Sequence, residues 1–527
     1  MSDQISARNI WLPLIMGVVM ASGIYIGTRM VAVPVATGNN KINDVLSYVQ
    51  DAYVDTVNRA QLTDKTIEKM LEQLDPHSSY IPAADLQAAN EPLEGNFEGI
   101  GIEFHIQQDT LMVVAALSGG PSEALGIQPG DRIIKVDEKI VAGKGITNDQ
   151  VFKMLRGKGG SKVKVAIKHP GSNKLTDYII TRGKIPIYSV DIAYMADAAT
   201  GYIKVSRFAE PTYDEFVAAL RKLKAQGMKK LILDLRGNPG GYLNAATDIA
   251  DEMIDGNRLL VYTLGKSRPR TDYKAGKPGL FENGKLAVLI DEGSASASEI
   301  VSGALQDWDR ATIIGRRSFG KGLVQEQSGF PDGSAMRLTV ARYYTPTGRC
   351  IQKTYANGVE AYNDDLLNRI KHGELMSADS VKITDTLKYR TPAGKIVYGG
   401  GGIMPDIFVP LDTTYDTDYL NSVASAGLLN QFAYDYVDSH RSELKTFSGA
   451  ADFRNRFNSN TILNNFYDFV EKKGVKRNAE QIKRSSGLIA VQLKAFIGRL
   501  IWQNEGLYPV LQDADPAFQR ALKFLNS

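Results

Sequence analysis

The chain has 527 residues, 43% of them hydrophobic, which suits a globular protein of about three or four domains. Its 62 lysines and arginines nearly balance its 59 aspartates and glutamates, so the charge gives no sign of a nucleic-acid partner. The single cysteine, Cys350, excludes an internal disulfide.

An uncharged and mostly apolar stretch lies near the start, at residues 10–27, flanked by Arg8 and Arg29. Its length is near the minimum for crossing a bilayer. A cleaved signal peptide is the alternative, but its apolar part would span about 7–15 residues, and no clear small-residue cleavage site follows Gly27. We therefore expect residues 1–39 to hold a retained membrane anchor and a linker.

Residues 40–92 carry apolar side chains at helical spacing, for example at Val45, Val49 and Ala52. Prolines at 76, 82 and 92 interrupt the pattern. We expect a helical packing segment and assign it no chemistry.

Residues 93–185 change to short β segments with one helical piece at 148–156. Two glycines, Gly99 and Gly101, stand before a β segment, where the lack of Cβ atoms lets a ligand backbone approach and leaves amides free. With GIGI at 99–102 and PGDRI at 129–133, this region resembles a PDZ domain. The resemblance implies that the glycine-rich loop holds a peptide's terminal carboxylate and that the next strand pairs with the peptide. Substrate binding is thus assigned to Gly99, Ile100, Gly101 and Ile102.

Residues 186–411 contain four short apolar runs separated by helical stretches, which predicts a largely parallel sheet. The expected strands are 202–205, 231–235, 286–290 and 311–315, and the expected helices are 213–225 and 243–253. The first glycine-rich turn, at 236–241, leads into a helix, so its amides could form an oxyanion hole or it could be a simple connector.

A serine cluster at 294–298 follows the third of these strands, and Lys321 lies between two glycines after the fourth. A serine needs an adjacent base to act as a nucleophile. The five histidines form no triad signature, and the G-x-S-x-G pattern is not met around Ser296. A lysine base would need its pKa lowered from about 10.4 to about 7–8, which burial can provide. The alternative is a packed helix cap beside a solvated lysine.

Several motifs in this order resemble the carboxy-terminal processing peptidases, the tail-specific serine–lysine proteases, across about residues 40–411. They are LDPHSSY at 74–80, LILDLRGNPGG at 231–241, GSASASEI at 293–300, FGKGLVQ at 319–325, YYTPTGRCIQ at 343–352 and GGGIMPDI at 400–407. The resemblance implies an α/β fold: a crotonase-like α/β sandwich protease core with an inserted β-rich PDZ domain, an N-terminal helical segment and a C-terminal helical extension.

The same resemblance assigns catalytic roles. The 25-residue separation of Ser296 and Lys321 matches the family's nucleophile and base, which selects Ser296 from its serine neighbours. Gln325 matches the glutamine that orients the lysine. The amides of Gly241 and Ala297 correspond to the oxyanion-hole donors.

Residues 412–527 lie outside these motifs and carry amphipathic helical faces, such as Ile489, Leu493 and Ile497. We expect a C-terminal helical domain. This domain could gate the substrate, bind an adaptor protein or form a homo-oligomer, but no motif supports any of these roles.

The resemblance implies a serine endopeptidase that recognises free C-termini of exported or membrane proteins through its PDZ domain and cleaves with a Ser-Lys dyad. A non-catalytic tail-binding scaffold on the same fold is the alternative, but it would not need Ser296, Lys321 and Gln325 together. Another acyl transfer is disfavoured because a PDZ domain implies a peptide ligand. With no H-E-x-x-H or P-loop pattern, we expect no metal and no cofactor. The predicted anchor at 10–27 indicates a single-pass protein of the inner (cytoplasmic) membrane. The resemblance implies that its catalytic part lies on the periplasmic or extracytoplasmic side.

Overall fold

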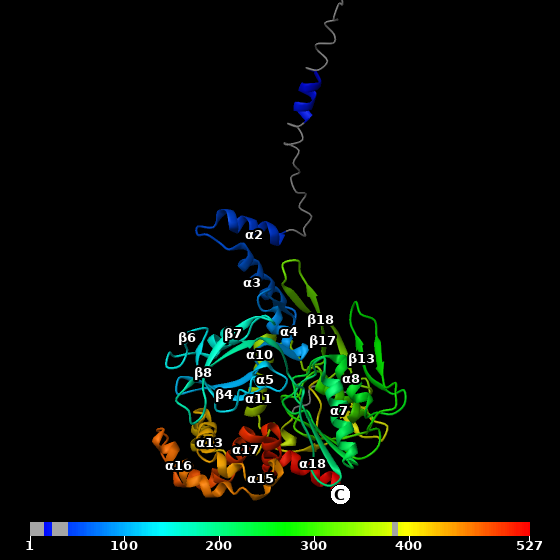
Figure 1. Cartoon of the computed structure of the whole chain (residues 1–527). Coiled ribbons are helices and arrows are strands. Elements are labelled where there is room, and N and C mark those ends of the chain that lie inside the picture. Colours follow the sequence, from blue (N-terminus) through cyan, green and yellow to red (C-terminus); the bar gives the residue numbers. More distant parts are fainter. Residues whose placement is uncertain (1–14, 24–40, 382–387) are drawn as a thin grey trace, which may run out of the picture. The chain divides into compact units, whose positions relative to one another are not determined.

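The computed structural model describes residues 15–23, 41–381 and 388–527, in two compact units that divide at residues 73 and 74. In the first unit, residues 15–23 are helical, and α2 (Lys41–Ala52) and α3 (Arg59–Glu72) follow (Figure 1). Half of the predicted anchor stretch, residues 10–14 and 24–27, lies outside the described residues. Within the described ranges, no helix is both long and apolar enough to cross a membrane.

The second unit opens with β1 (Ser79–Ile81) and α4 (Leu86–Glu94). The expectation of helices throughout residues 40–92 was wrong for β1, which pairs antiparallel with β18 (Ala335–Tyr344). Three residues are too few to show the alternation of apolar and polar side chains that predicts a strand from sequence. The strand that β1 pairs with, β18, also lies far along the chain. Pro92, expected to interrupt a helix, lies inside α4.

The β-rich region that follows forms one sheet in the order β3-β4-β5-β7-β8, with β6 paired to β5. Strands β2 and β9 pair antiparallel, so the region begins and ends at one place, as an inserted domain requires. The predicted β segments are present as a run of short strands, and the helical piece predicted at 148–156 falls on α6. The elements are β2 (Asn96–Gly99), β3 (Ile102–Gln107), β4 (Thr110–Ala116), α5 (Pro121–Ala124), β5 (Arg132–Val136), β6 (Lys139–Ile140), α6 (Asn148–Leu155), β7 (Lys162–Lys168), β8 (Leu175–Thr181) and β9 (Gly183–Pro186).

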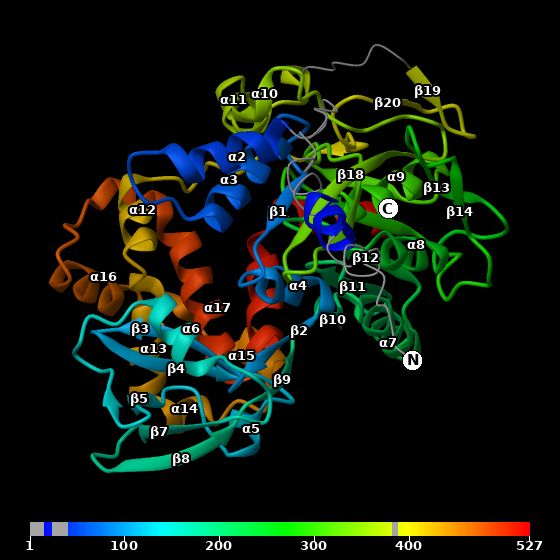
Figure 2. The ribbon, with the colours of Figure 1, turned by 90° about the horizontal axis from the view of Figure 1, so that it is seen from above.

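The core of the unit is a sheet in the order β10-β11-β12-β15-β16-β21, in which only the β10–β11 pair is antiparallel. Helices α7 and α8 lie beside β11 and β12 (Figure 2). The elements are β10 (Val190–Met195), β11 (Thr200–Val205), α7 (Thr212–Ala225), β12 (Lys230–Asp234), α8 (Leu243–Asp251), β15 (Leu286–Ile290), α9 (Ala297–Asp307), β16 (Thr312–Gly315) and β21 (Ile407–Phe408).

Both faces of this sheet are buried. Leu231 and Leu233 of β12 pack toward α7, α8 and α9, whereas Ile232 between them faces the opposite side, since side chains alternate along a strand. Phe518 and Leu525 of α18 (Pro516–Asn526) cover that opposite side. The last helix of the chain therefore completes the α/β sandwich, although the sequence analysis grouped it with a separate helical domain.

A second sheet stands next to the first, in the order β1-β18-β13-β14, with β17 also paired to β18. The β17–β18 hairpin follows Lys321 directly. The remaining elements of this region are β13 (Leu259–Leu264), β14 (Thr271–Lys274), β17 (Leu323–Gly329), α10 (Gly358–Asn363), α11 (Asp365–Lys371), β19 (Lys388–Arg390) and β20 (Ile396–Tyr398).

The C-terminal helices pack around their own aromatic core, which includes Phe453, Phe466 and the predicted face of Ile489, Leu493 and Ile497. The longest, α17, bends at Trp502 and Gln503, where the backbone leaves helical geometry. The helices are α12 (Asp418–Ser425), α13 (Leu428–Ser439), α14 (Arg441–Leu444), α15 (Ala450–Arg456), α16 (Leu463–Lys472) and α17 (Ala479–Leu511).

Candidate active site

Four of the residues predicted to act in catalysis line one cavity of about 740 Å³: Gly241, Ser296, Lys321 and Gln325. They come from the turn after β12, the residue before α9, the loop after β16, and β17. Parallel strands deliver the turns that follow them to one edge of a sheet, which is why these segments converge. The fifth, Ala297, is fully buried at the start of α9.

Ser296 lies at a sharp turn between β15 and α9. Its backbone has φ 53° and ψ −113°, a conformation that residues with side chains rarely adopt. Surrounding hydrogen bonds hold it there: its N–H donates to Glu299, and its carbonyl accepts from the Tyr343 hydroxyl at 3.0 Å. A strained strand-to-helix turn thus presents this serine even though the G-x-S-x-G pattern is absent.

The Glu299 carboxylate joins the serine turn to the lysine loop. It is fully buried and accepts hydrogen bonds from Ser296 N at 2.8 Å and Lys321 N at 2.9 Å. Gly320 N and the Ser318 hydroxyl donate to it as well, at 2.7 and 2.5 Å. Burial raises the pKa of Glu299, while the four donors act in the opposite direction. Sequence reasoning gave Glu299 no role, although the Ser-x-x-Glu capping spacing was a readable signal.

Burial also lowers the pKa of the Lys321 side chain, the direction that a general base requires. The carboxylates of Glu299 and Asp75 oppose this shift, and Arg337 adds to it. The Tyr343 hydroxyl lies 2.6 Å from the Lys321 carbonyl oxygen and 3.0 Å from that of Ser296, and these two acceptors share its single proton, so one side chain ties both segments together.

Ser296 and Lys321 share the cavity without being joined by a hydrogen bond between their side chains in the described part of the chain. Lys321 and Gln325 also line this cavity, and no hydrogen bond joins their side chains in the described residues. Catalytic hydrogen bonds often tighten only when substrate is bound, so this geometry is compatible with a Ser-Lys dyad.

The two predicted oxyanion donors are brought together by close packing of the glycine turn against α9. A Cβ atom on Gly240 would lie 2.7 Å from the Ser296 Cβ and 2.9 Å from the Ala297 nitrogen. A Cβ on Gly241 would lie 2.0 Å from the Phe208 carbonyl oxygen. Only glycine allows this approach, so the residue type follows from the contact.

The segment before β1, to which the sequence analysis assigned no chemistry, lies close enough to Lys321 for Asp75 and His77 to interact with it electrostatically. Asp75 accepts hydrogen bonds from Ser78, from the His77 N–H and from the Thr339 hydroxyl. His77 binds the Tyr362 hydroxyl at 2.8 Å, and burial together with Lys321 lowers its pKa to about 4. The only sequence signal for this segment was its LDPHSSY motif.

The predicted peptide-binding loop, Gly99–Ile102, lies in the β-rich region and does not line the catalytic cavity. Gly101 has φ +75°, and a Cβ there would lie 2.8 Å from the Ile185 side chain. The following strand, β3, is the end strand of its sheet, so its outer edge can accept a peptide strand.

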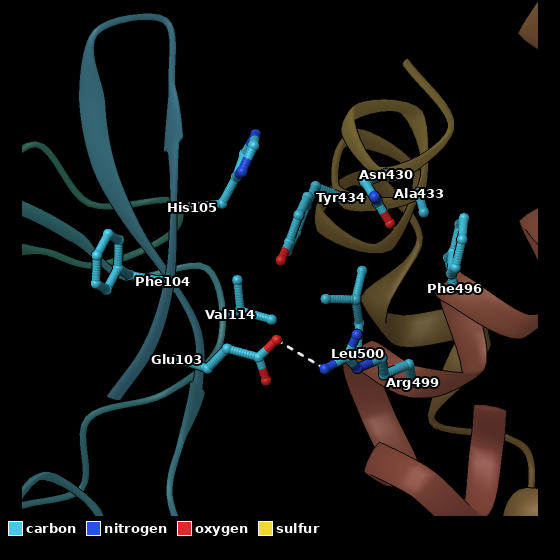
Figure 3. A pocket seen from close by; sticks show the side chains of 10 residues that line it. All are labelled: Glu103, Phe104, His105, Val114, Asn430, Ala433, Tyr434, Phe496, Arg499 and Leu500. Carbon is cyan, nitrogen blue, oxygen red and sulfur yellow. Dashed lines mark hydrogen bonds and ion pairs between the residues drawn. The ribbon is translucent and has the colours of Figure 1, made fainter. Parts of the chain in front are cut away.

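Strand β3 also contacts the C-terminal helices, around a smaller pocket of about 130 Å³ (Figure 3). Across it, Glu103 of β3 pairs with Arg499 of α17 at 2.7 Å. Farther along α17, the Tyr508 hydroxyl donates to Asp191 of β10 at 2.7 Å. One helix therefore touches both the β-rich region and the core sheet.

Comparison with known proteins assigns the chain to a family. The model of peptidase family S41 matches residues 199–361, and the PDZ domain model matches residues 92–168. The carboxy-terminal processing protease CtpB of Bacillus subtilis is 32% identical over 358 residues, which cover 66% of this chain and 71% of that protein. The chain belongs to peptidase family S41. It carries a PDZ domain, and a family of unknown function matches residues 419–503.

Other similar proteins align over different shares of the chain. A probable CtpA-like serine protease of Staphylococcus aureus is 36% identical over 315 residues, covering 59% of this chain. The chain spans 62% of the length of that relative. Among solved structures, the photosystem II D1 C-terminal processing protease is 27% identical, with a TM-score of 0.38 over 72% of this chain and 88% of that one.

Replacing Glu299 by glutamine tests the buried carboxylate. The amide has the size of the carboxylate but no charge. Its NH₂ group would face groups that all donate hydrogen bonds to Glu299 in the wild type. We expect a loss of about 1–3 kcal/mol in the free energy of unfolding, measured by denaturant titration.

The matched control is Glu138→Gln, since Glu138 forms only an exposed ion pair with Lys164 and should leave stability unchanged. Equal stability of Glu299→Gln and the wild type would contradict a central role for this carboxylate.

Proposed function

We propose that this chain is a serine endopeptidase that recognises C-terminal tails through its PDZ domain and cleaves with Ser296 and Lys321. The observation that carries the proposal is a strained serine and a buried lysine of lowered pKa on the wall of one cavity. A tail-binding scaffold would need no lysine with a lowered pKa at that place.

In the proposed reaction, neutral Lys321 accepts the hydroxyl proton as Ser296 Oγ attacks the peptide carbonyl carbon. The amides of Gly241 and Ala297 stabilise the negative oxygen of the tetrahedral intermediate. Lys321 then returns the proton to the leaving amine as the C–N bond breaks, which leaves an ester on Ser296. Water then attacks the ester carbon as Lys321 accepts its proton. The bond between the acyl carbon and Oγ breaks, Lys321 returns the proton to Ser296 Oγ, and the new C-terminus is released.

The dyad predicts that Ser296→Ala and Lys321→Ala each abolish peptide cleavage while the fold is kept, because neither residue acts without the other. Lys321→Arg should also be inactive, since arginine stays protonated and cannot accept a proton. In the wild type, kcat/KM should rise with pH as Lys321 loses its proton, with a midpoint below the ordinary lysine value of 10.5 because burial lowers this pKa.

Cleavage of a peptide with a free tail is the measurement, and thermal melting checks the fold of each variant. Full activity of Ser296→Ala would sink the peptidase proposal. If all three variants and the wild type bind the peptide but none cleaves it, the scaffold alternative stands.

We further propose that tail binding does more than hold substrate nearby, because β3 and the core are both in contact with α17. Gly101→Val should then weaken tail binding and lower kcat at saturating peptide, since the competent arrangement would be less populated. The measurement is steady-state cleavage of one peptide with a free and with an amidated C-terminus.

Gly126→Val is the control for this test, because Gly126 has the same φ of +75° but open space around it. It adds the same backbone strain away from the carboxylate loop. Equal kcat for both peptides in every variant would rule out coupling between tail binding and turnover.

For localisation, we propose that residues 10–27 remain as a single membrane anchor in the cytoplasmic membrane, with the catalytic part on the periplasmic side. The uncharged stretch between Arg8 and Arg29 supports this. The full-length chain should stay in the membrane pellet after a high-salt wash. A soluble mature chain that begins after Gly27 would instead identify a cleaved signal.

A further inference from the structure

Three segments far apart in the sequence meet through one line of hydrogen bonds at the catalytic cavity. The Gln325 amide nitrogen Nε2 lies 3.2 Å from the Thr339 hydroxyl oxygen. That oxygen lies 3.0 Å from Oδ1 of Asp75. Gln325 also lines the cavity wall that contains Lys321.

The β17–β18 hairpin sets this geometry. Gln325 and Thr339 are direct partners in its antiparallel register, which shifts between Val324 and Gln325. Such an irregularity re-aims the side chain that follows it. The Thr339 N–H donates to the Ser78 hydroxyl at 3.1 Å, so the segment of Asp75 is fastened to the same strand.

We propose that Asp75 and Thr339 are positioning residues that orient the Gln325 side-chain amide so that its oxygen, and not its nitrogen, faces Lys321. The inference rests on the proposed function, because it assigns Gln325 to the lysine of the dyad. Asp75 and Thr339 would support the reaction only by positioning Gln325, since they touch neither the substrate nor the reacting atoms.

Which group donates in each of these hydrogen bonds follows from which groups carry protons. An ionised carboxylate can only accept hydrogen bonds. Asp75 is in that form at neutral pH: burial opposes ionisation, but hydrogen bonds from Ser78, His77 and Thr339 hold its pKa below the ordinary value. Thr339 has a single hydroxyl proton, which must therefore point to Asp75.

The remaining lone pairs of the Thr339 hydroxyl can only accept. Gln325 must then present its NH₂ group to Thr339, since the reversed amide would place oxygen against oxygen. Its carbonyl oxygen is left on the other side of the amide, as an acceptor in the cavity. An amine or ammonium nitrogen donates to such an oxygen, which would fix the Lys321 Nζ with respect to Ser296.

The test replaces the hydroxyl and keeps the shape. Thr339→Val is isosteric and suits a strand, so the hairpin is retained, but Gln325 becomes free to turn over. We expect kcat to fall about 10- to 100-fold with KM nearly unchanged, because only the alignment of the base is lost. Thr339→Ser should restore most of the activity. Thr271→Val, an exposed strand threonine of the same sheet, is the control and should resemble the wild type.

A merely structural role is distinguished by a double-mutant cycle with Gln325→Ala. If Thr339 acts through Gln325, Thr339→Val should cost little further activity once Gln325 is removed. The same fold-loss in both backgrounds would overturn the inference, as would wild-type kcat in Thr339→Val. Should Thr339→Val fail to fold, Thr339→Ser and Thr339→Ala offer the same comparison, because both lack the methyl group and they differ only in the hydroxyl.

These results separate the inference from the proposed function. If Ser296→Ala abolishes cleavage and Thr339→Val matches the wild type, the dyad stands and the orienting role of Thr339 falls. If Ser296→Ala still cleaves, the proposed peptidase mechanism falls first, and the positioning role falls with it.

Discussion

One buried carboxylate, Glu299, holds together the two segments that carry Ser296 and Lys321. Glu299 accepts hydrogen bonds from Ser296 N on one segment and from Gly320 N, Lys321 N and the Ser318 hydroxyl on another. Burying a carboxylate is costly unless its oxygens are satisfied, and here four donors satisfy them. The strained backbone of Ser296 persists because this carboxylate and the Tyr343 hydroxyl hold it on both sides. Losing the carboxylate would release the serine turn and the lysine loop together.

The environment of Lys321 reflects a balance between opposing effects. Desolvation favours the neutral amine that a base requires, while Glu299 and Asp75 favour the ammonium ion. Desolvation is the largest of these effects, so the pKa of Lys321 is lowered. The two carboxylates limit how far the pKa of Lys321 falls. They themselves accept hydrogen bonds mainly from backbone amides and hydroxyls. Each carboxylate thus holds the structure through its hydrogen bonds and also lies close enough to Lys321 to influence its pKa.

The domains of this S41 chain are connected through packing as well as through the chain. The PDZ region starts and ends at the β2–β9 pair, which leaves its sheet as a separate body with a free edge at β3. Helix α17 contacts that same strand through Arg499, which pairs with Glu103 (Figure 3). It contacts the core through Tyr508. A ligand that pairs with β3 therefore binds to a strand that already touches the C-terminal helices.

The sequence by itself was sufficient for the fold class, the family and the PDZ domain, because strand and helix periods, glycine turns and motif order are local features. It also singled out Gly241, Ser296, Lys321 and Gln325, which the fold gathers around one cavity; their roles stay predictions. Contacts across long separations had no local signal. Only the tertiary structure decided that β1 pairs with β18, that α18 covers the core sheet, and that Asp75 reaches Gln325 through Thr339. Each of these joins segments whose meeting depends on how the whole chain packs, because a side chain's partners are set by the fold and not by its neighbours in sequence.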